Sequence, residues 1–429
     1  MRVIADLHLH SKYSRATSPQ MDVVNLAIWG KKKGINLLAT GDITHPVYLK
    51  ELKEQLVEDG SGFLELKNRR TKEHKDIETK EQKNIRTYGD VKFILSGEVS
   101  CIYKHNDKTR RQHHCVYFPD FKSVDRFNKI LVDKGCNLRS DGRPIIGLSS
   151  RDLLEVVLCA NKEAMLIPAH IWTPWFALFG SKSGYDSKEE CFGDLSEHVF
   201  AMETGLSSDP AMNWRLSQLD NVTLISSSDA HSLKMIGREA NVFEFDEFTY
   251  DELRNTLKNK DLNKFKYTIE FYPQEGKYYY DGHRECGVVM SPEESLKYNN
   301  ICPKCKKEMV LGVDHRIQDL ADRKVGYQLK KTVPFKSVIP LYEILAEIRG
   351  VGKNSKRVWA DYEEIIEKGG SEFNVLLELS QKEIEKISNP VLAEAIIRMR
   401  EGKVNAQPGY DGEFGIIKVF SQAELDKLK

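Results

Sequence analysis

Short apolar runs alternate with amphipathic segments through the first 270 residues of the chain. The runs lie at 3–9, 35–40, 92–100, 114–118, 164–172, 198–205 and 222–232. Between the first two runs, Ser18 and Pro19 are typical of a helix start and Gly34 of a helix end, which predicts a helix there. Strands that alternate with helices favour a mainly parallel sheet, and so many units predict that the sheet closes into a barrel.

Histidines and carboxylates stand at the ends of these apolar runs. The C-terminal ends of barrel strands open on one mouth, so these side chains are expected to converge there. His8 and His10 also share one face of their strand, since side chains alternate. Mixed imidazole and carboxylate ligands suit Zn²⁺, Mn²⁺ or Fe²⁺, and the set is too large for one ion. The residues are His8, His10, Asp42, His45, Glu98, His114, His170, Glu203, Asp229 and His231.

A second candidate metal site follows residue 270, where the alternation stops. His283 and Cys286 form one pair, and Cys302 and Cys305 form another after 15 intervening residues. This spacing is typical of a closed tetrahedral zinc ribbon, so the expected zinc is structural. His315 is an alternative to His283 as the fourth ligand.

The last part of the chain has the apolar spacing of helices at 340–350, 357–369 and 390–402. The turn at 348–358, IRGVGKNSKRV, resembles a helix-hairpin-helix turn that binds a DNA phosphate, or else is a simple turn between helices. We therefore predict three domains, at 1–272, 273–333 and 334–429.

Charge gives no global indication of a partner, because 64 Lys and Arg balance 64 Asp and Glu. Two local segments are basic, 67–86 and 104–111, and either bind phosphates or are solvated surfaces. The sequence shows no signal peptide and no apolar run long enough to span a bilayer. We expect an intracellular, cytoplasmic protein without a membrane partner.

The motifs HLHSKYS, SGEVS, PAH and SSDAH resemble those of the polymerase-and-histidinol-phosphatase (PHP) superfamily of metal-dependent phosphoesterases. The resemblance implies a distorted (β/α)7 barrel, with metal ligands at His8, His10, Glu98, His114, His170, Asp229 and His231. Two positions depart from the pattern. Arg15 stands where the superfamily often has Asp or His, and GDITH replaces TDH, so that either Asp42 or His45 takes that ligand's place. Arg15 either binds a phosphate oxygen or forms a surface salt bridge.

The order of barrel, DGHRECG with CPKC, and a helical tail ending in PGYDGEFG is similar to that of the endonuclease Q family over the whole chain. The resemblance implies cleavage of DNA on the 5′ side of deaminated bases (hypoxanthine, uracil, xanthine) or abasic sites, leaving 3′-hydroxyl and 5′-phosphate ends. It implies two or three divalent ions (Zn, Mn, Mg or Fe) besides one structural zinc, and Arg15, Asp229 and His231 as catalytic residues. DNA is the expected partner, and DNA replication or repair proteins are further candidates.

The expected wall of a base pocket is segment 170–187, directly after His170. Its Trp172, Trp175, Phe176 and Phe179 either stack on a flipped base or pack as an ordinary barrel lid. Arg110 and Arg111 are expected phosphate contacts. Two rival functions remain open: a PHP-type phosphatase acting on a small phosphomonoester, and a nucleic-acid-binding scaffold without catalysis.

Overall fold

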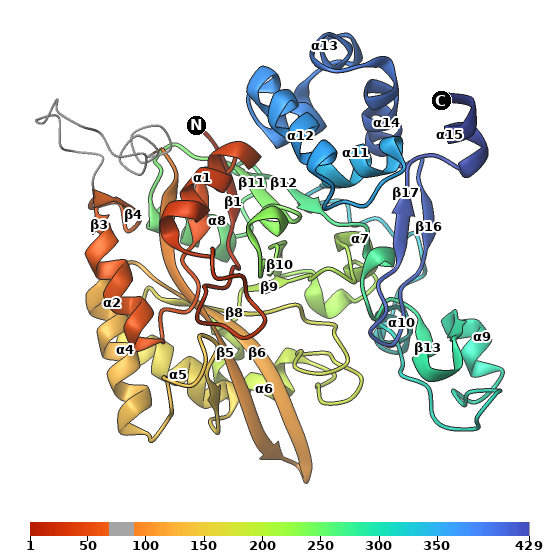
Figure 1. Ribbon diagram of the computed structural model, residues 1–429. Helices are drawn as coiled ribbons and strands as arrows, with labels where there is room; N and C mark the ends of the chain where they lie inside the picture. The colour runs from red at the N-terminus through yellow and green to blue at the C-terminus, as the bar shows by residue number, and fades with distance from the viewer. Residues whose placement is uncertain (68–89, 429) are drawn as a thin grey trace, which may run out of the picture.

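The computed structural model describes residues 1–67 and 90–428, so residues 68–86 of the first basic segment lie outside the described residues. The helices and the adjoining small elements surround a barrel, with a helical tail and a small hairpin module beside it (Figure 1). Within the described ranges, the structure has no helix that is long and apolar enough to cross a membrane. The helices are α1 Val23–Lys33, α2 Pro46–Gln55, α4 Phe121–Asp133, α5 Ser150–Ala160, α6 Lys188–Phe192, α7 Pro210–Asn213, α8 Tyr250–Lys258, α9 Pro292–Leu296, α10 Val313–Leu320, α11 Leu341–Arg349, α12 Lys356–Gly369, α13 Gln381–Ile387, α14 Pro390–Arg400 and α15 Gln422–Leu428.

Seven strands form the ring of the barrel. β1, β2, β5, β6 and β8 are joined in this order in one sheet, and β9 pairs with β10. The Ile171 amide donates to the Glu203 carbonyl between β8 and β9, and a bridge between Leu9 and Ala230 joins β1 to β10. The strands are β1 Arg2–Asp6, β2 Leu37–Ala39, β3 Leu56–Glu58, β4 Leu64–Leu66, β5 Lys92–His105, β6 Lys108–Phe118, β7 Ile145–Ile146, β8 Met165–Pro168, β9 Ala201–Glu203, β10 Thr223–Ile225, β11 Ala240–Glu244, β12 Phe265–Glu270, β13 Asp281–His283, β14 Val288–Met290, β15 Phe335–Ser337, β16 Asn405–Gln407 and β17 Ile416–Lys418.

The barrel is more mixed than the expected mainly parallel sheet. β6 runs antiparallel to both β5 and β8, and β11 and β12 extend the sheet antiparallel beyond β1. β5 and β6 are joined by Asn106 and Asp107 alone, both at positive φ (51° and 58°). Asn and Asp tolerate this backbone conformation, and two such residues match the twist of a hairpin. A local turn thus replaces the helical crossover that a parallel pair would require.

The helix after β1 begins later than the sequence predicts. Asp22 caps α1, its side chain accepting from the Asn25 amide, and Gly34 ends the helix at φ 88° as expected. Residues 11–21 instead form a loop at the barrel mouth, where the Ser18 amide donates to the His231 carbonyl at 2.8 Å. This arrangement ties the first histidine motif to the last one.

The small module and the tail are connected through the β16–β17 hairpin, which returns beside residues 273–280 (Figure 1). The Gly409 amide donates to the Gln274 carbonyl and the Gly415 amide to the Glu275 carbonyl. Helices α11, α12 and α14 pack beside the barrel, and the turn 350–355 between α11 and α12 begins at Gly350 in the left-handed conformation. The predicted DNA contact of that turn stays a prediction, as do the three domain boundaries.

The buried carboxyl group of Glu270, at the end of β12, makes stability depend on pH. It accepts hydrogen bonds from Ser226 and Thr268, but burial raises its pKa to about 8. Between its ordinary pKa of 4.5 and about 8, the folded protein keeps a proton that the unfolded chain has released. The free energy of unfolding therefore falls as pH rises through this window, by up to about 1.4 kcal/mol per pH unit.

Glu270→Gln is expected to flatten this fall, since an amide does not ionise. Urea unfolding at pH 5 and pH 8 measures the difference in each protein. Glu197→Gln, at an exposed position, serves as the control and should keep the wild-type slope. Equal pH slopes for Glu270→Gln and the wild type would contradict the assignment.

Candidate metal centre

Two buried histidines leave β1 side by side at the barrel mouth. The rings of His8 and His10 are 5.4 Å apart, while Leu9 between them is buried on the other face. Within residues 1–67 and 90–428, the Nε2 atoms of both rings have no hydrogen-bond partner, and neither has Oδ1 of Asp229, which lies 3.2 Å from His10 Nε2. Unpartnered buried nitrogen and oxygen atoms that face one another fit a metal ion, because burial without a partner is costly.

Three overlapping groups of possible ligand atoms converge here, each with its atoms within 4.8 Å of one another. Glu98 joins two groups, because its Oε2 lies 3.2 Å from His10 Nε2 and its Oε1 lies 3.1 Å from His170 Nε2. The arrangement would hold more than one ion, with Glu98 as a possible ligand in two of the three groups. The groups are His8, His10 and Glu98; His10, Asp229 and His231; and Glu98, His113 and His170.

Carboxylates behind the histidines hold their rings in place. Nδ1 of His8 lies 3.1 Å from Glu203, which also accepts from the His170 amide at 2.9 Å. Nδ1 of His10 lies 3.0 Å from the Ser14 hydroxyl and 3.4 Å from Asp42. Such partners fix the tautomer and leave the opposite nitrogen free to bind a metal.

Two neighbouring side chains favour the ionised form of Glu98. Burial opposes its charge, but His113 and Arg143 hold the pKa of this carboxyl group well below its usual range. The Arg143 guanidinium donates to Glu98 Oε2 at 2.9 Å. His113 and Arg143 were not identified from the sequence as partners of Glu98. The available signal for Arg143 was its position just before the strand β7.

His113, and not the expected His114, faces the centre. Nδ1 of His113 lies 2.7 Å from Glu98, whereas His114 lies on the opposite face of β6, its Nε2 2.8 Å from the Ser150 hydroxyl. Burial lowers the pKa of His114 to about 3, so this imidazole is neutral. Side chains alternate along a strand, so the neighbours His113 and His114 lie on opposite faces of β6, and only one of them can face the metal centre.

One of Asp42 and His45 was expected to be a metal ligand, but the structure gives both residues other contacts. Asp42 accepts from Ser11 and Ser14 and supports His10 from behind. His45 caps helix α2, where its Nδ1 accepts from the Tyr48 amide, and stacks on Tyr13 at 4.5 Å. Neither residue belongs to a ligand group in the described part of the chain.

Arg15 forms the surface salt bridge that was its alternative interpretation. Its side chain is 81% exposed, and Nε lies 3.3 Å from Asp141. The loop after Asp141 approaches the first motif closely, since the Gly142 amide donates to the Tyr13 carbonyl and a Cβ at Gly142 would lie 2.3 Å from Asp42. This close approach brings Arg143, rather than Arg15, to the centre.

The expected aromatic wall is divided between two roles. Trp172 is fully buried and donates to Asn213 at 2.8 Å, so it cannot stack on a base, and Phe179 packs against it. Phe176 packs against His113 with ring centroids 4.6 Å apart and the planes tilted by 38°, and Trp175 meets Tyr278 edge-on. Of the four aromatic residues, Trp175 and Phe176 thus remain candidate substrate contacts.

His283, Cys286, Cys302 and Cys305 form the fourth ligand group, within the β13–β14 module. Cys305 Sγ lies 3.8 Å from His283 Nε2. The alternative residue, His315, does not belong to this ligand group in the described ranges, and its Nδ1 lies 2.5 Å from the buried carboxylate of Asp281. Three thiolates with one imidazole fit a structural zinc.

Metal content tests which face of β6 carries the metal ligand. His113→Gln should lose metal from the centre, whereas His114→Gln should keep the wild-type metal content and lose only stability. Elemental analysis of both purified variants measures the bound ions, and thermal unfolding reports their folding. Loss of metal from His114→Gln alone would contradict the observed register.

Comparisons with known proteins agree with this architecture. Residues 214–262 match the family described as PHP-associated, and residues 340–403 match the MJ0043 C-terminal domain. Protein MJ0043 of Methanocaldococcus jannaschii is 34% identical over 253 residues, which make up 57% of this chain and 31% of MJ0043, so the match spans about a third of that protein. Protein YqxK of Bacillus subtilis is 28% identical over 97% of this chain and 99% of its own.

Two solved structures match nearly the whole chain. The lesion-specific endonuclease PfuEndoQ from Pyrococcus furiosus aligns over 100% of both chains with a TM-score of 0.83 and 29% identity. Endonuclease Q in complex with a 27-mer duplex that carries an abasic lesion at the active site covers 99% of this chain and 98% of its own, with a TM-score of 0.83 and 31% identity. The chain therefore belongs to the endonuclease Q family of lesion-specific endonucleases.

Proposed function

We propose that the protein is a metal-dependent DNA repair endonuclease that hydrolyses the phosphodiester 5′ to a deaminated base or an abasic site. The observation that carries this proposal is a cavity of about 410 Å³ whose wall includes three residues of the metal centre. His170, Asp229 and His231 line one side of it, and the aromatic side chains of Phe271, Tyr278 and Phe414 line another. Metal ligands beside stacking surfaces suit a flipped nucleotide.

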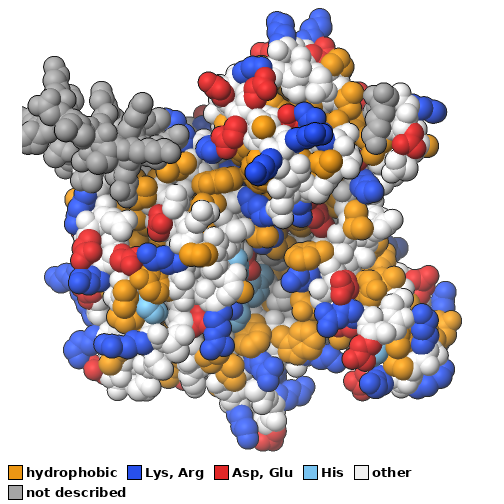
Figure 2. Space-filling view, in the orientation of Figure 1, with side chains coloured by type: hydrophobic (Ala, Val, Ile, Leu, Met, Phe, Trp, Pro, Cys, Tyr) orange, Lys and Arg blue, Asp and Glu red, His pale blue; other side chains and the backbone are white. Residues whose placement is uncertain are grey.

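Glycines give the cavity its shape. Gly205 has φ 73°, and a Cβ there would lie 2.6 Å from His170 Cβ. Gly276 lies against Ser207, where a Cβ would meet backbone at 2.8 Å. The chain after the barrel can therefore lie against the loop that follows β9, and brings Tyr278 to the centre. Figure 2 shows histidine side chains at the bottom of a hollow between these parts.

The chain's own residues prepare the reaction. His8, His10, Glu98, His113, His170, Asp229 and His231 would hold two or more divalent ions, which when bound supply a hydroxide near neutral pH and neutralise phosphate charge. Glu203 and Asp42 orient the imidazoles. Arg143 lies beside Glu98 with its side chain 28% exposed, so its guanidinium can also donate to a non-bridging phosphate oxygen. In-line attack then leaves 3′-hydroxyl and 5′-phosphate ends.

The relatives support DNA as the substrate, since the 27-mer complex holds a duplex with an abasic lesion. Uracil, hypoxanthine and xanthine as lesions, and DNA replication or repair proteins as partners, belong to the proposal. A small-molecule phosphatase is less well supported, because the aromatic wall of the cavity, from residues 271–278 and from Phe414, offers stacking surfaces for a base. A scaffold without catalysis is disfavoured by the three ligand groups at the mouth.

The experiment compares three substrates with Mn²⁺ or Mg²⁺: a duplex with one hypoxanthine, the same duplex with adenine, and a small phosphomonoester. Incision of the hypoxanthine duplex alone is the expected result. Turnover of the phosphomonoester alone would favour the phosphatase, and salt-sensitive duplex binding without incision would favour the scaffold.

A further inference from the structure

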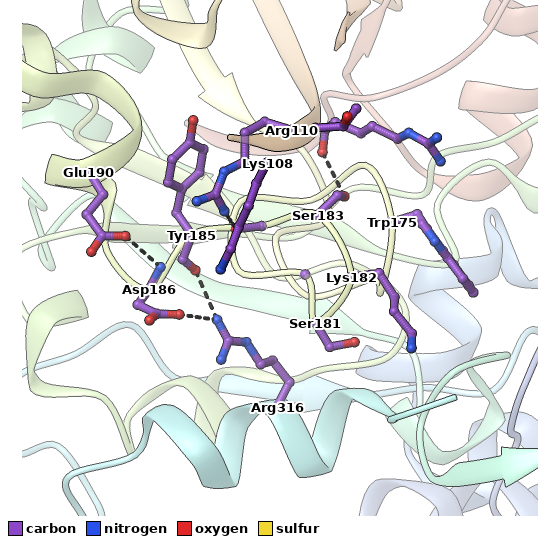
Figure 3. A pocket seen from close by; sticks show the side chains of 14 residues that line it. Lys108, Arg110, Trp175, Ser181, Lys182, Ser183, Tyr185, Asp186, Glu190 and Arg316 are labelled. Atoms are coloured by element: carbon purple, nitrogen blue, oxygen red, sulfur yellow. Dashed lines mark hydrogen bonds and ion pairs between the residues drawn. The ribbon is translucent and has the colours of Figure 1, made fainter. Parts of the chain in front are cut away.

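A second cavity, of about 690 Å³, lies outside the metal centre (Figure 3). The turn end of the β5–β6 hairpin, at residues 108–111, forms one wall, the segment 180–186 forms another, and Arg316 of α10 reaches it from a third side. We name it the basic cleft. The charged and aromatic residues that line it are Lys108, Arg110, Arg111, Trp175, Lys182, Tyr185, Asp186, Glu190 and Arg316.

Three cations of the basic cleft have neither a carboxylate nor a carbonyl partner for their side chains among the residues that the structure describes. They are Lys108, Arg111 and Lys182. Arg316, in contrast, pairs with Asp186 and donates to the Phe179 carbonyl at 2.9 Å. Five cations line the basic cleft against the two carboxylates of Asp186 and Glu190. This excess of positive charge favours an anion that binds between the cations.

The walls of the basic cleft are held in place before any ligand binds. Arg110 donates to the Gly184 carbonyl, and its guanidinium lies 4.0 Å from the ring centre of Tyr185. The Gln112 amide donates to the Ser183 carbonyl at 3.1 Å. Arg110 thus serves the architecture of the site, while the unpaired cations remain free for a ligand. A preformed site loses less entropy on binding.

A path of neighbouring residues leads from the metal centre into the basic cleft. His113 lies 3.3 Å from His170, which lines the cavity of the metal centre. The Phe176 ring packs against the ring of His113. The Arg111 guanidinium in turn lies 5.8 Å from the centre of the Phe176 ring. Arg111 and His113 point to the same face of β6, two residues apart. A chain of phosphates that crosses the metal centre would therefore meet Arg111 next.

We infer that the basic cleft binds the phosphodiester backbone on the 5′ side of the incision, with Trp175 as a stacking surface for a base of that flank. The inference rests on the proposed function. If the lesion nucleotide occupies the cavity and its 5′ phosphate lies at the metal centre, the strand that continues in the 5′ direction leaves along His113 and Phe176. The cations of the basic cleft then hold the segment that ends in the 3′-hydroxyl product.

The test uses the full-length protein, its Arg111→Ala/Lys182→Ala double variant, and hypoxanthine duplexes whose labelled strand is shortened on one side only. The wild type should lose affinity, as a KM increase of about tenfold, when the 5′ flank is cut from about ten nucleotides to two. The double variant should show a similar KM increase with the long substrate and little further increase with the short one. Its KM should also depend less steeply on salt, because fewer phosphates are neutralised.

The matched control is Lys162→Ala, which removes an exposed charge from the loop before β8, away from the strand ends that carry the ligands. It should behave as the wild type with every substrate. A double variant that remains sensitive to the 5′ flank, or that loses its response to the 3′ flank instead, would overturn the inference while incision by the wild type continues. A wild type that incises no lesion duplex would overturn the proposed function itself.

Discussion

Glu98→Gln should reduce incision of lesion DNA by at least about 10³-fold, or about 4 kcal/mol of transition-state stabilisation. Glu98 belongs to two of the ligand groups, as does His10, and its two oxygens face different histidines. The glutamine amide offers one oxygen, which carries no negative charge, so it cannot replace the two carboxylate oxygens as metal ligands. Single-turnover rates at saturating metal measure the loss.

The control for this variant is metal content together with folding. Glu98→Gln should unfold cooperatively and bind fewer ions at the centre, while the zinc of the β13–β14 module remains. A variant that keeps its metal ions and cuts at the wild-type rate would show that Glu98 is not a metal ligand of the centre.

Lys33→Met is expected to lower the free energy of unfolding by about 3–5 kcal/mol, the range for a buried charge that loses its partner. Lys33 Nζ lies 2.6 Å from Glu372 Oε2, and both side chains are buried. This ion pair connects α1 of the barrel to the segment after α12. Glu372 also accepts from the Leu341 amide and the Tyr362 hydroxyl, so its charge would stay buried without a cation. Urea unfolding measures the change.

The neighbouring residue provides a matched control, because Lys32 pairs with Glu363 of α12 at the surface. Lys32→Met should cost less than about 1 kcal/mol, since exposed pairs contribute little. Equal losses for the two variants would mean that burial does not decide the strength of this contact.

The convergence of the site was predictable from the sequence, because polar residues at strand ends meet wherever such strands close into a ring. His8, His10, Glu98, His170, Asp229 and His231 lie together for this reason. The choice between His113 and His114 was not predictable in the same way. Both histidines are buried, and only the register of β6 against β5, set by the Asn106–Asp107 turn, decides which of them faces Glu98.

The cavity wall could not be predicted from one segment. Trp172 and Phe179 follow a ligand in sequence but fill the core, whereas Phe271 and Phe414 are 143 positions apart and meet at the centre only through the returning β16–β17 hairpin. Arg143 was missed for a related reason, since its position depends on the close approach that Gly142 allows. Long-range contacts of this kind leave no periodic signal in the sequence.

The position of the cut tests the account most directly. A duplex labelled at the 5′ end of the strand that carries one hypoxanthine is incubated with Mn²⁺, and the labelled product is sized and then offered to a DNA polymerase. The account predicts a fragment that ends at the nucleotide before the lesion and that the polymerase can extend from a 3′-hydroxyl. A fragment that contains the lesion, a 3′ end blocked by phosphate, or an uncut strand would contradict it.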